Sequence, residues 1–363
     1  MLQLLVFFAI FTSIIFGWAY AMSILIIGLF PFLSAFTLHW MLFSLSSTTL
    51  FIVGLMAGNV FQSEIISVIY RIGSIWLGAL TITGGIAIVF MIIAQIFGLT
   101  YTHVGFFILF IILALTVNIW GIYASYVPRI TEYSVNIEKN HDWHGKKIIM
   151  VADTHYGNIY GREDARRLVE RINSLSGEIV IIPGDFFDGP KIDYEAVAQE
   201  FRNIKAPLGT LFANGNHEEY RNTGVIIESL ENAGITILNN KKVTLNGMTF
   251  AGVTYHASES AAGLGHNLDT LNLKKDEPVI LLKHKPTLYT TIQEYPIDLV
   301  VSGHTHRGQM WPFSYITDLI YKKYSYGMNI DNTLTSITTS GVGSWGPPQR
   351  IGTRSEIVVI NIQ

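Results

Sequence analysis

The sequence predicts a membrane-embedded helical half followed by a layered α/β half, and two observations support this division. The 363 residues include 24 Lys and Arg and 27 Asp and Glu, yet only Glu64 and Arg71 of these lie within residues 1–126. From about residue 146, short apolar runs that end in polar clusters alternate with segments of helical spacing. We therefore expect a transmembrane region at 1–126, a linker at 127–145 and a folded domain at 146–363.

Four apolar stretches are long enough to cross a bilayer, which takes about 20 residues of helix. They lie at roughly 3–28, 31–57, 73–98 and 104–126. The first resembles a signal peptide in length, but no Lys or Arg precedes it and three further stretches follow, which favours a retained helix. Gly84 and Gly85 indicate close packing between helices. These features predict a multi-pass protein of the cell membrane.

The distribution of basic residues favours a cytoplasmic domain. Four spans place the N-terminus, the connection from Glu64 to Arg71 and the C-terminal domain on one side of the membrane. Basic residues near the spans mark the cytoplasmic side, and here they all lie on that shared side: Arg71, Arg129, Lys139, Lys146 and Lys147. The assignment depends on the number of spans, because one span fewer would reverse it.

Net charge and cysteine content exclude several classes of function. The formal net charge of −3 gives no general attraction to nucleic acid or anionic lipid, so we expect no nucleic acid as a partner. Membrane lipids are expected as partners because of the apolar half. The chain has no cysteine, which excludes disulfides, thiolate catalysis and cysteine-based zinc sites.

The pattern after residue 146 predicts strands and helices that alternate before strands become more frequent. Strands are expected at 147–152, 178–183 and 208–213, and helices at 164–175, 194–203 and 223–233. Further strands are expected at 235–238, 242–246, 248–254, 278–283, 298–302, 334–340 and 355–362. The Ser- and Gly-rich stretch 254–267, with His256 and His266, is expected to be a loop. This order suggests a layered α/β sandwich.

Five polar clusters each follow an apolar run, where loops at the carboxyl ends of strands collect ligands. They are Asp153-Thr154-His155, Gly184-Asp185, Gly215-Asn216-His217, His284 and Gly303-His304-Thr305-His306. Carboxylate and amide oxygens and imidazole nitrogens suit Mn, Fe, Zn, Co or Mg. The candidate ligands are Asp153, His155, Asp185, Asn216, His284, His304 and His306, too many for one ion. We therefore expect two divalent metal ions, held roughly 3.5–4 Å apart by a shared carboxylate.

Two cations in such a site suit phosphoryl transfer. They neutralise the charge on the phosphate oxygens and lower the pKa of a bridging water, so that hydroxide exists near neutral pH. The leaving oxygen then needs a proton, which a histidine beside the metals can supply. His217, next to Asn216, is the candidate for this catalytic role.

The five clusters, in this order, resemble the calcineurin-like metallophosphoesterase superfamily, whose pattern is D-x-H, G-D, G-N-H-D/E, H and G-H-x-H. The apolar N-terminal half, the Gly-Asn-His-Glu form and the tail Trp345–Arg350 resemble its bacterial membrane-associated YkuE/YaeI-type branch. The resemblance implies a four-layered α/β/β/α sandwich with two mixed sheets. It also implies a first metal on Asp153, His155, Asp185 and His306, and a second on Asp185, Asn216, His284 and His304.

Other residues keep two interpretations. By the resemblance, Glu218 replaces an Asp that orients the neighbouring histidine. Asp188 is expected either to bond a ligand histidine or to form a turn, and Arg307 either to contact substrate phosphate or to form a surface salt bridge. The aromatic and Lys-containing segment 310–326 is expected either to lie at the bilayer interface or to be a core-packing loop.

These observations predict a membrane-anchored, metal-dependent phosphoric ester hydrolase acting on a phosphomonoester, phosphodiester or pyrophosphate by a metal-bridging hydroxide. Its substrate is expected to be a phosphorylated small molecule or a lipid-linked one, such as the UDP-diacylglucosamine that the resemblance implies for some relatives. The alternative is a non-catalytic membrane sensor or scaffold that binds a phosphorylated ligand. A transporter is disfavoured, because the apolar half carries few ionisable groups.

Overall fold

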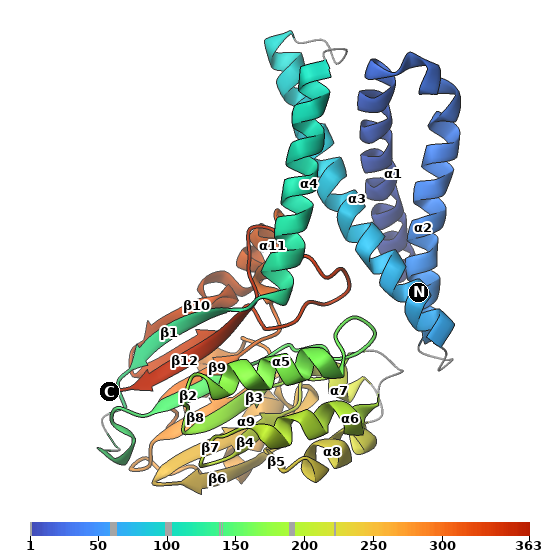
Figure 1. Cartoon of the computed structure of the whole chain (residues 1–363). Coiled ribbons are helices and arrows are strands. Elements are labelled where there is room, and N and C mark those ends of the chain that lie inside the picture. Colours follow the sequence, from blue (N-terminus) through green and yellow to red (C-terminus); the bar gives the residue numbers. More distant parts are fainter. Residues whose placement is uncertain are drawn as a thin grey trace. The chain divides into compact units, whose positions relative to one another are not determined.

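The chain forms two compact units in the structure, a computed structural model (Figure 1). It describes residues 2–58, 64–98, 104–137, 139, 141–188, 193–220 and 223–363. The helical unit contains Met1–Tyr123 and Gly346–Gln349, and the α/β unit contains Ala124–Trp345 and Arg350–Gln363.

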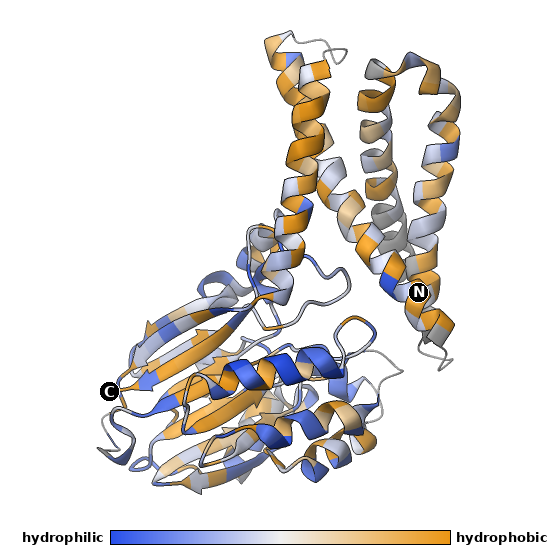
Figure 2. Cartoon of the chain, in the orientation of Figure 1, coloured by the Kyte–Doolittle hydropathy of each residue, from blue (hydrophilic) through white to orange (hydrophobic). Residues whose placement is uncertain are grey.

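The helical unit is built from long apolar helices, as Figure 2 shows by colour. They are α1 (Leu2–Leu29), α2 (Thr37–Gly58), α3 (Glu64–Phe97) and α4 (Val104–Tyr126), with a short 3₁₀ helix at Pro31–Phe36 between α1 and α2. Three segments have the length and composition to cross a membrane, Pro31–Gly54, Ile65–Phe97 and Val104–Tyr126, and Thr12–Gly28 is a shorter apolar helix. The predicted span begins at residue 73, whereas helix α3 begins at Glu64. Hydropathy identifies the part of a helix that suits a bilayer, and the helix itself extends beyond that part.

Glycines allow close approach inside the helical unit. A Cβ added at Gly84 would lie 2.4 Å from Cβ of Trp18, and one at Gly54 would lie 2.9 Å from Cα of Tyr70. Gly85 has nothing within 4 Å of such an atom, so only the first of the two predicted glycines has a packing role among the described residues. The segment Gly346–Gln349 also belongs to this unit, and Nε2 of Gln349 donates to Oδ1 of Asn118 at 3.3 Å.

The α/β unit contains two six-stranded mixed sheets. The first has the order β1-β12-β2-β3-β4-β5, in which β12 is antiparallel to β2 and the other pairs are parallel. The second has the order β10-β11-β9-β8-β7-β6, parallel except for its two outer pairs. The strands of the first sheet are β1 (Arg129–Val135), β2 (Lys147–Met150), β3 (Ile179–Pro183), β4 (Thr210–Ala213), β5 (Ile235–Ile237) and β12 (Glu356–Ile362). Those of the second are β6 (Lys241–Leu245), β7 (Met248–Gly252), β8 (Val279–Leu282), β9 (Leu299–Ser302), β10 (Gly327–Asp331) and β11 (Leu334–Thr338).

Helices cover the outer face of each sheet. The α-helices are α5 (Arg162–Asn173), α6 (Tyr194–Ala198), α7 (Asn216–Glu219), α8 (Thr223–Asn232), α9 (Ala261–Thr270), α10 (Tyr289–Ile292) and α11 (Phe313–Tyr321). Five 3₁₀ helices lie at His141–Trp143, Gln199–Asn203, His256–Ser258, His306–Gly308 and Lys322–Ser325.

Three hydrophobic cores separate four layers, which confirms the predicted α/β/β/α sandwich. Alternation along β2 sends Ile149 into a core with residues of α5, α6 and α8, and Ile148 into the core between the two sheets. The outer face of the second sheet packs on α9 and α10 through Leu264 and Ile292. The parallel strands β2, β3, β4, β8 and β9 therefore present their carboxyl ends from two packed sheets.

The structure differs from the sequence-based expectations in three places. The segment 127–145, expected to be a linker, contains β1, which pairs with β12 along its whole length. The stretch 254–267, expected to be a loop, contains most of α9, whose N-terminus is capped by the Ser260 side chain. The segment 310–326, for which one interpretation was a core-packing loop, contains α11 and the 3₁₀ helix Lys322–Ser325.

Candidate metal centre

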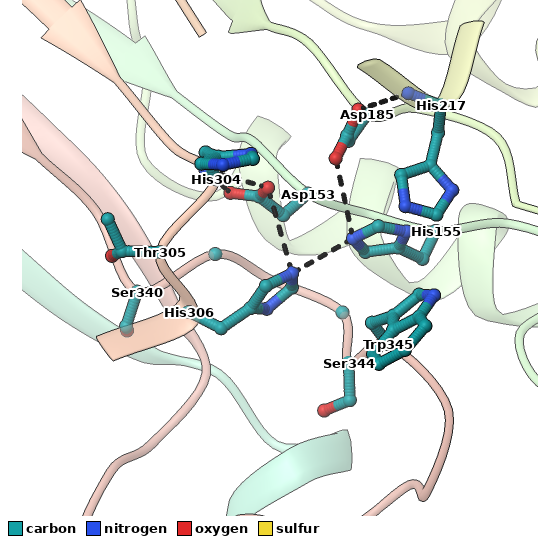
Figure 3. Close-up of polar contacts among 12 residues, drawn as sticks. Asp153, His155, Asp185, His217, His304, Thr305, His306, Ser340, Ser344 and Trp345 are labelled. Carbon is teal, nitrogen blue, oxygen red and sulfur yellow. Dashed lines mark hydrogen bonds and ion pairs between the residues drawn. The ribbon is translucent and has the colours of Figure 1, made fainter. Parts of the chain in front are cut away.

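Each predicted ligand follows the carboxyl end of a strand. Asp153 and His155 follow β2, Asp185 follows β3, and Asn216 begins α7 after β4. From the second sheet, His284 follows β8, and His304 and His306 follow β9. Seven side chains distant in sequence therefore lie where the two sheets end. Figure 3 labels Asp153, His155, Asp185, His304 and His306 among them.

The backbone at these positions has an uncommon conformation. Five of the residues have a left-handed φ, namely Asp153 (53°), His155 (49°), Asp185 (53°), His304 (72°) and His306 (46°). A non-glycine residue in this region costs of order 1–3 kcal/mol, so it persists only where the surroundings impose it. Such a concentration of strained residues is typical of functional sites.

Asp153, His155 and His306 form one cluster that could hold a metal ion. The Nε2 atoms of the two histidines lie 2.9 Å apart, and Oδ1 of Asp153 lies 3.7 Å from Nε2 of His306. All three side chains are buried. Two imidazole nitrogens that point at each other beside a carboxylate are the arrangement expected around a cation.

Asp185, His284 and His304 form a second such cluster. Nδ1 of His284 donates to the Pro183 carbonyl at 2.8 Å, which directs Nε2 toward Oδ2 of Asp185 at 3.0 Å. Oδ1 of Asn216 lies 3.0 Å from Nδ1 of His304, which places the amide beside this cluster. Asp185 also lies 3.9 Å from Nε2 of His155, so its carboxylate stands between the two clusters.

Buried nitrogen atoms test whether the residues fit metal ions. Nε2 of His284 makes no hydrogen bond within the described part of the chain, although it lies beside Asp185. Burial lowers the pKa of His155 to about 4 and that of His304 to about 3, so both imidazoles are neutral, as metal ligation requires. Burial also opposes protonation of His284, but Asp185 and Asp153 outweigh it and raise the pKa of His284 to about 9. The oxygen and nitrogen ligand set and these orphaned nitrogens fit two divalent cations.

The two carboxylates are both buried, but their pKa values shift in opposite directions. Burial raises the pKa of Asp153 to about 7. Burial also opposes ionisation of Asp185, but His284 and neighbouring histidines outweigh it and hold the pKa of Asp185 well below its usual range. Asp185 is therefore a charged group at the centre of the site, in the position expected of a shared ligand.

His217 lies beside both clusters. Its backbone N–H donates to Oδ1 of Asp185 at 2.9 Å, and its ring contacts that of His155 with centroids 4.8 Å apart. Nδ1 lies 3.0 Å from Oδ1 of Asp188. Burial opposes protonation of His217, but Asp188 and Asp185 outweigh it and raise the pKa of His217 to about 9. Asp188 therefore bonds the candidate acid itself and stabilises its protonated form.

Glu218 does not orient the ring of His217, contrary to the expectation from the resemblance. Its carboxylate is fully buried and accepts hydrogen bonds from four backbone N–H groups, those of Asp185 (3.0 Å), Phe186 (2.8 Å), Phe187 (3.1 Å) and Gly215 (2.9 Å). It thereby joins the loop after β3 to the loop after β4. Asp188 is the residue that orients His217.

Arg350 is a residue of the site that the sequence did not reveal. It is fully buried, and its guanidinium donates to the carbonyls of Ser340 and Gly343 and approaches Nδ1 of His306 at 3.2 Å. Gly343 in turn donates its N–H to the Asp153 carbonyl at 2.8 Å. Arg350 thus supports two candidate ligands, and the one available signal was its place in the tail after Trp345.

The remaining candidates lie outside the two clusters. The guanidinium carbon of Arg307 lies 4.3 Å from the centre of the Tyr326 ring, a cation–π contact that neither predicted role anticipated. His256 is exposed beside Glu219 and Glu259, and His266 is exposed on α9.

Comparison with known proteins decides the family. The model of the calcineurin-like phosphoesterase family matches residues 146–308. An uncharacterised metallophosphoesterase of Helicobacter pylori strain J99 is 32% identical over 268 residues, 72% of this chain and 70% of that protein. The chain belongs to the calcineurin-like phosphoesterase family.

Other members of the family differ in length. The uncharacterised metallophosphoesterase YkuE of Bacillus subtilis is 30% identical over 66% of this chain and 89% of its own. The match covers 64% of the protein of another H. pylori strain and 62% of a Danio rerio transmembrane protein with a metallophosphoesterase domain, which is 29% identical over 70% of this chain. A crystal structure of a D. rerio dimetal phosphatase aligns over 60% of this chain and 99% of its own, with 14% identity and a TM-score of 0.39.

Proposed function

We propose that this chain is a membrane-anchored, dinuclear-metal phosphoesterase. The observation that carries the proposal is the pair of clusters on either side of Asp185, with His217, which also groups with His155 and Asp185, beside them. When bound, two divalent cations would neutralise the phosphate oxygens and make a water molecule acidic enough to attack phosphorus. Mn, Fe, Zn, Co and Mg all suit these ligands.

The chain's own residues orient the reaction and move the proton. His217 carries a proton at neutral pH because Asp188 accepts a hydrogen bond from its Nδ1, which leaves Nε2 to donate to the leaving oxygen. Asp188 is largely buried, with 15% of its side chain exposed. Glu218 holds the backbone around Asp185 and Asn216, so the ligands are positioned before substrate arrives.

Membrane attachment rests on the apolar helices. Three of them have the length and composition of membrane spans, and relatives from D. rerio and Bos taurus are named as transmembrane proteins with a metallophosphoesterase domain. We propose that α1 (Leu2–Leu29) also crosses the bilayer, so that the protein has four spans. With four spans, the N-terminus, Arg71 and the catalytic unit share one side, and the positive-inside rule makes that side the cytoplasmic face of the cell membrane.

A lipid-linked phosphate is the substrate that this architecture favours. A membrane-attached enzyme meets amphiphilic esters at high local concentration, and a nucleotide-linked lipid such as UDP-diacylglucosamine combines a pyrophosphate bond with acyl chains. Comparison of UDP-diacylglucosamine with water-soluble UDP-N-acetylglucosamine tests this proposal. Equal cleavage of both, with no preference for the acylated compound, would reject it.

Metal content and turnover of the purified full chain test the central proposal. With manganese added, we expect hydrolysis of bis-p-nitrophenyl phosphate, loss of that activity on chelation, and recovery on readdition of metal. Asp185→Ala and Asn216→Ala should lose bound metal and activity, whereas Asp276→Asn, at an exposed carboxylate, should keep both. A chain that binds two metals and phosphate but turns over no mono-, di- or pyrophosphate ester would instead be a sensor or scaffold.

A further inference from the structure

Helix α11 presents its apolar side chains outward. None of its residues is buried, and the exposed fractions reach 66% at Tyr315, 52% at Ile316, 80% at Leu319 and 62% at Ile320. Trp311, just before the helix, is 55% exposed. A helix on a soluble protein normally buries such a stripe, so this face needs a partner.

Helix α11 directs its apolar face outward and most of its polar residues inward, the reverse of an ordinary surface helix. The outward residues Tyr315, Ile316, Leu319 and Ile320 follow the spacing of one helix face. The positions between them are mostly polar. Ser314 and Thr317 are half-buried and the ring of Tyr321 lies 6.0 Å from that of His304, so these residues face the body of the unit. Asp318 is exposed, and its carboxylate accepts from the Ser325 hydroxyl.

Contacts on both sides fix this orientation. Before the helix, the Trp311 N–H donates to the Ile351 carbonyl at 2.8 Å, and a Cβ added at Gly308 would lie 2.4 Å from the Ser314 nitrogen. After it, Tyr324 stacks on Tyr289 with ring centroids 3.8 Å apart. The outward apolar face is therefore held in place by the surrounding chain.

The chemistry of the helix and its ends identifies a bilayer as the partner. Tryptophan and tyrosine favour the boundary between headgroups and acyl chains, and lysine beside them favours anionic headgroups. Trp311 and Tyr315 supply the aromatic rings, and the exposed Lys322 follows the helix directly. The next residue, Lys323, pairs with Asp331. The same chain carries helices suited to span a membrane, so a bilayer is the apolar phase already available to this face.

We propose that α11 is an interfacial helix that inserts Tyr315, Ile316, Leu319 and Ile320 into the membrane surface. Through the contact of Tyr321 with His304, this insertion brings the second metal cluster to the height of lipid headgroups. The proposal rests on the membrane attachment proposed above and is independent of the bond that is hydrolysed.

Because the chain has no cysteine, a single introduced cysteine can be labelled specifically, which makes a direct test possible. Leu319→Cys carries a nitrobenzoxadiazole fluorophore in the full chain, reconstituted in nanodiscs of phosphatidylethanolamine and phosphatidylglycerol. The matched control is Val225→Cys on α8, an apolar side chain of the same unit that is 45% exposed. Lipid with a nitroxide near the headgroup should quench the label at 319 several-fold more than that at 225, and aqueous iodide should show the reverse order.

Two outcomes would overturn the proposal. Equal quenching at 319 and 225 would mean that α11 stays in water, and a label at 319 shielded from both quenchers would mean that protein covers this face. Neither readout needs turnover. A quenched label in a chain without phosphoesterase activity would therefore reject the proposed function alone, and an active chain with an unquenched label would reject this inference alone.

Discussion

Glu218 gives a prediction whose size can be worked out from its four hydrogen bonds. One carboxylate oxygen accepts from Asp185 and Gly215, and the other accepts from Phe186 and Phe187. In Glu218→Gln, the amide nitrogen replaces one oxygen, so two buried N–H groups lose their acceptor whichever way the amide turns. Each orphaned donor costs about 1–3 kcal/mol, which predicts a loss of about 2–6 kcal/mol from a typical total of about 5–15 kcal/mol.

Urea unfolding and metal analysis of the purified full chain would measure this effect. The Gln variant should unfold at lower urea and lose metal, because the loops that carry Asp185 and Asn216 are no longer joined. Glu218→Asp keeps both oxygens and should retain more metal, whereas Glu228→Gln, at an exposed carboxylate, is the matched control and should change nothing. A Gln variant with parental stability and metal content would refute this account of Glu218.

Three further changes test other parts of the unit. Asp188→Asn should lower the pKa of His217, moving the alkaline limb of the pH profile of kcat to lower pH, and reduce turnover roughly 10–100-fold; an unmoved profile would exclude this pairing. Gly341 has a φ of +79°, and the Cβ that Gly341→Ala adds would lie 2.7 Å from Cβ of Asp153, so isothermal titration should show weaker metal binding. Unchanged metal affinity would show that the loop can shift to accommodate the added methyl group. Glu356→Gln should destabilise the unit by roughly 3 kcal/mol in thermal unfolding at pH 7. Burial opposes ionisation of Glu356, but the Ser340 N–H and nearby hydroxyls lower its pKa below the ordinary 4.5. Its stabilising effect is therefore present above pH 4.5 and lost as pH falls through the lowered pKa, so the difference between parent and variant should shrink in acid; a constant difference would contradict this assignment.

The positions of the candidate ligands were predictable because each is encoded locally. A run of apolar residues followed at once by Asp or His marks a strand that ends at a site, as at Asp153 and Asp185. Because parallel strands end at the same edge of a sheet, the seven predicted side chains lie close together in the structure.

The supporting residues were less predictable because their roles depend on long-range contacts. Asp188 and Glu218 each act through contacts with another loop. Local sequence shows only that Asp188 lies three residues after Asp185 and that Glu218 follows His217. Arg350 reaches His306 from a segment with no helical or strand periodicity. The orientation of α11 also escaped prediction, since an amphipathic pattern shows that one face is apolar but not whether that face points inward.

The pairing of β1 with β12 has a consequence for biogenesis. Strand β12 lies between β1 and β2, and its partner residues Arg129 and Glu356 are 227 residues apart in sequence. During synthesis, β1 emerges directly after α4 but has no neighbour in its sheet until residues 356–362 leave the ribosome. Closure of this edge is therefore a late event, and the core between the sheets stays open to solvent, proteases and chaperones until Val358 and Ile360 arrive.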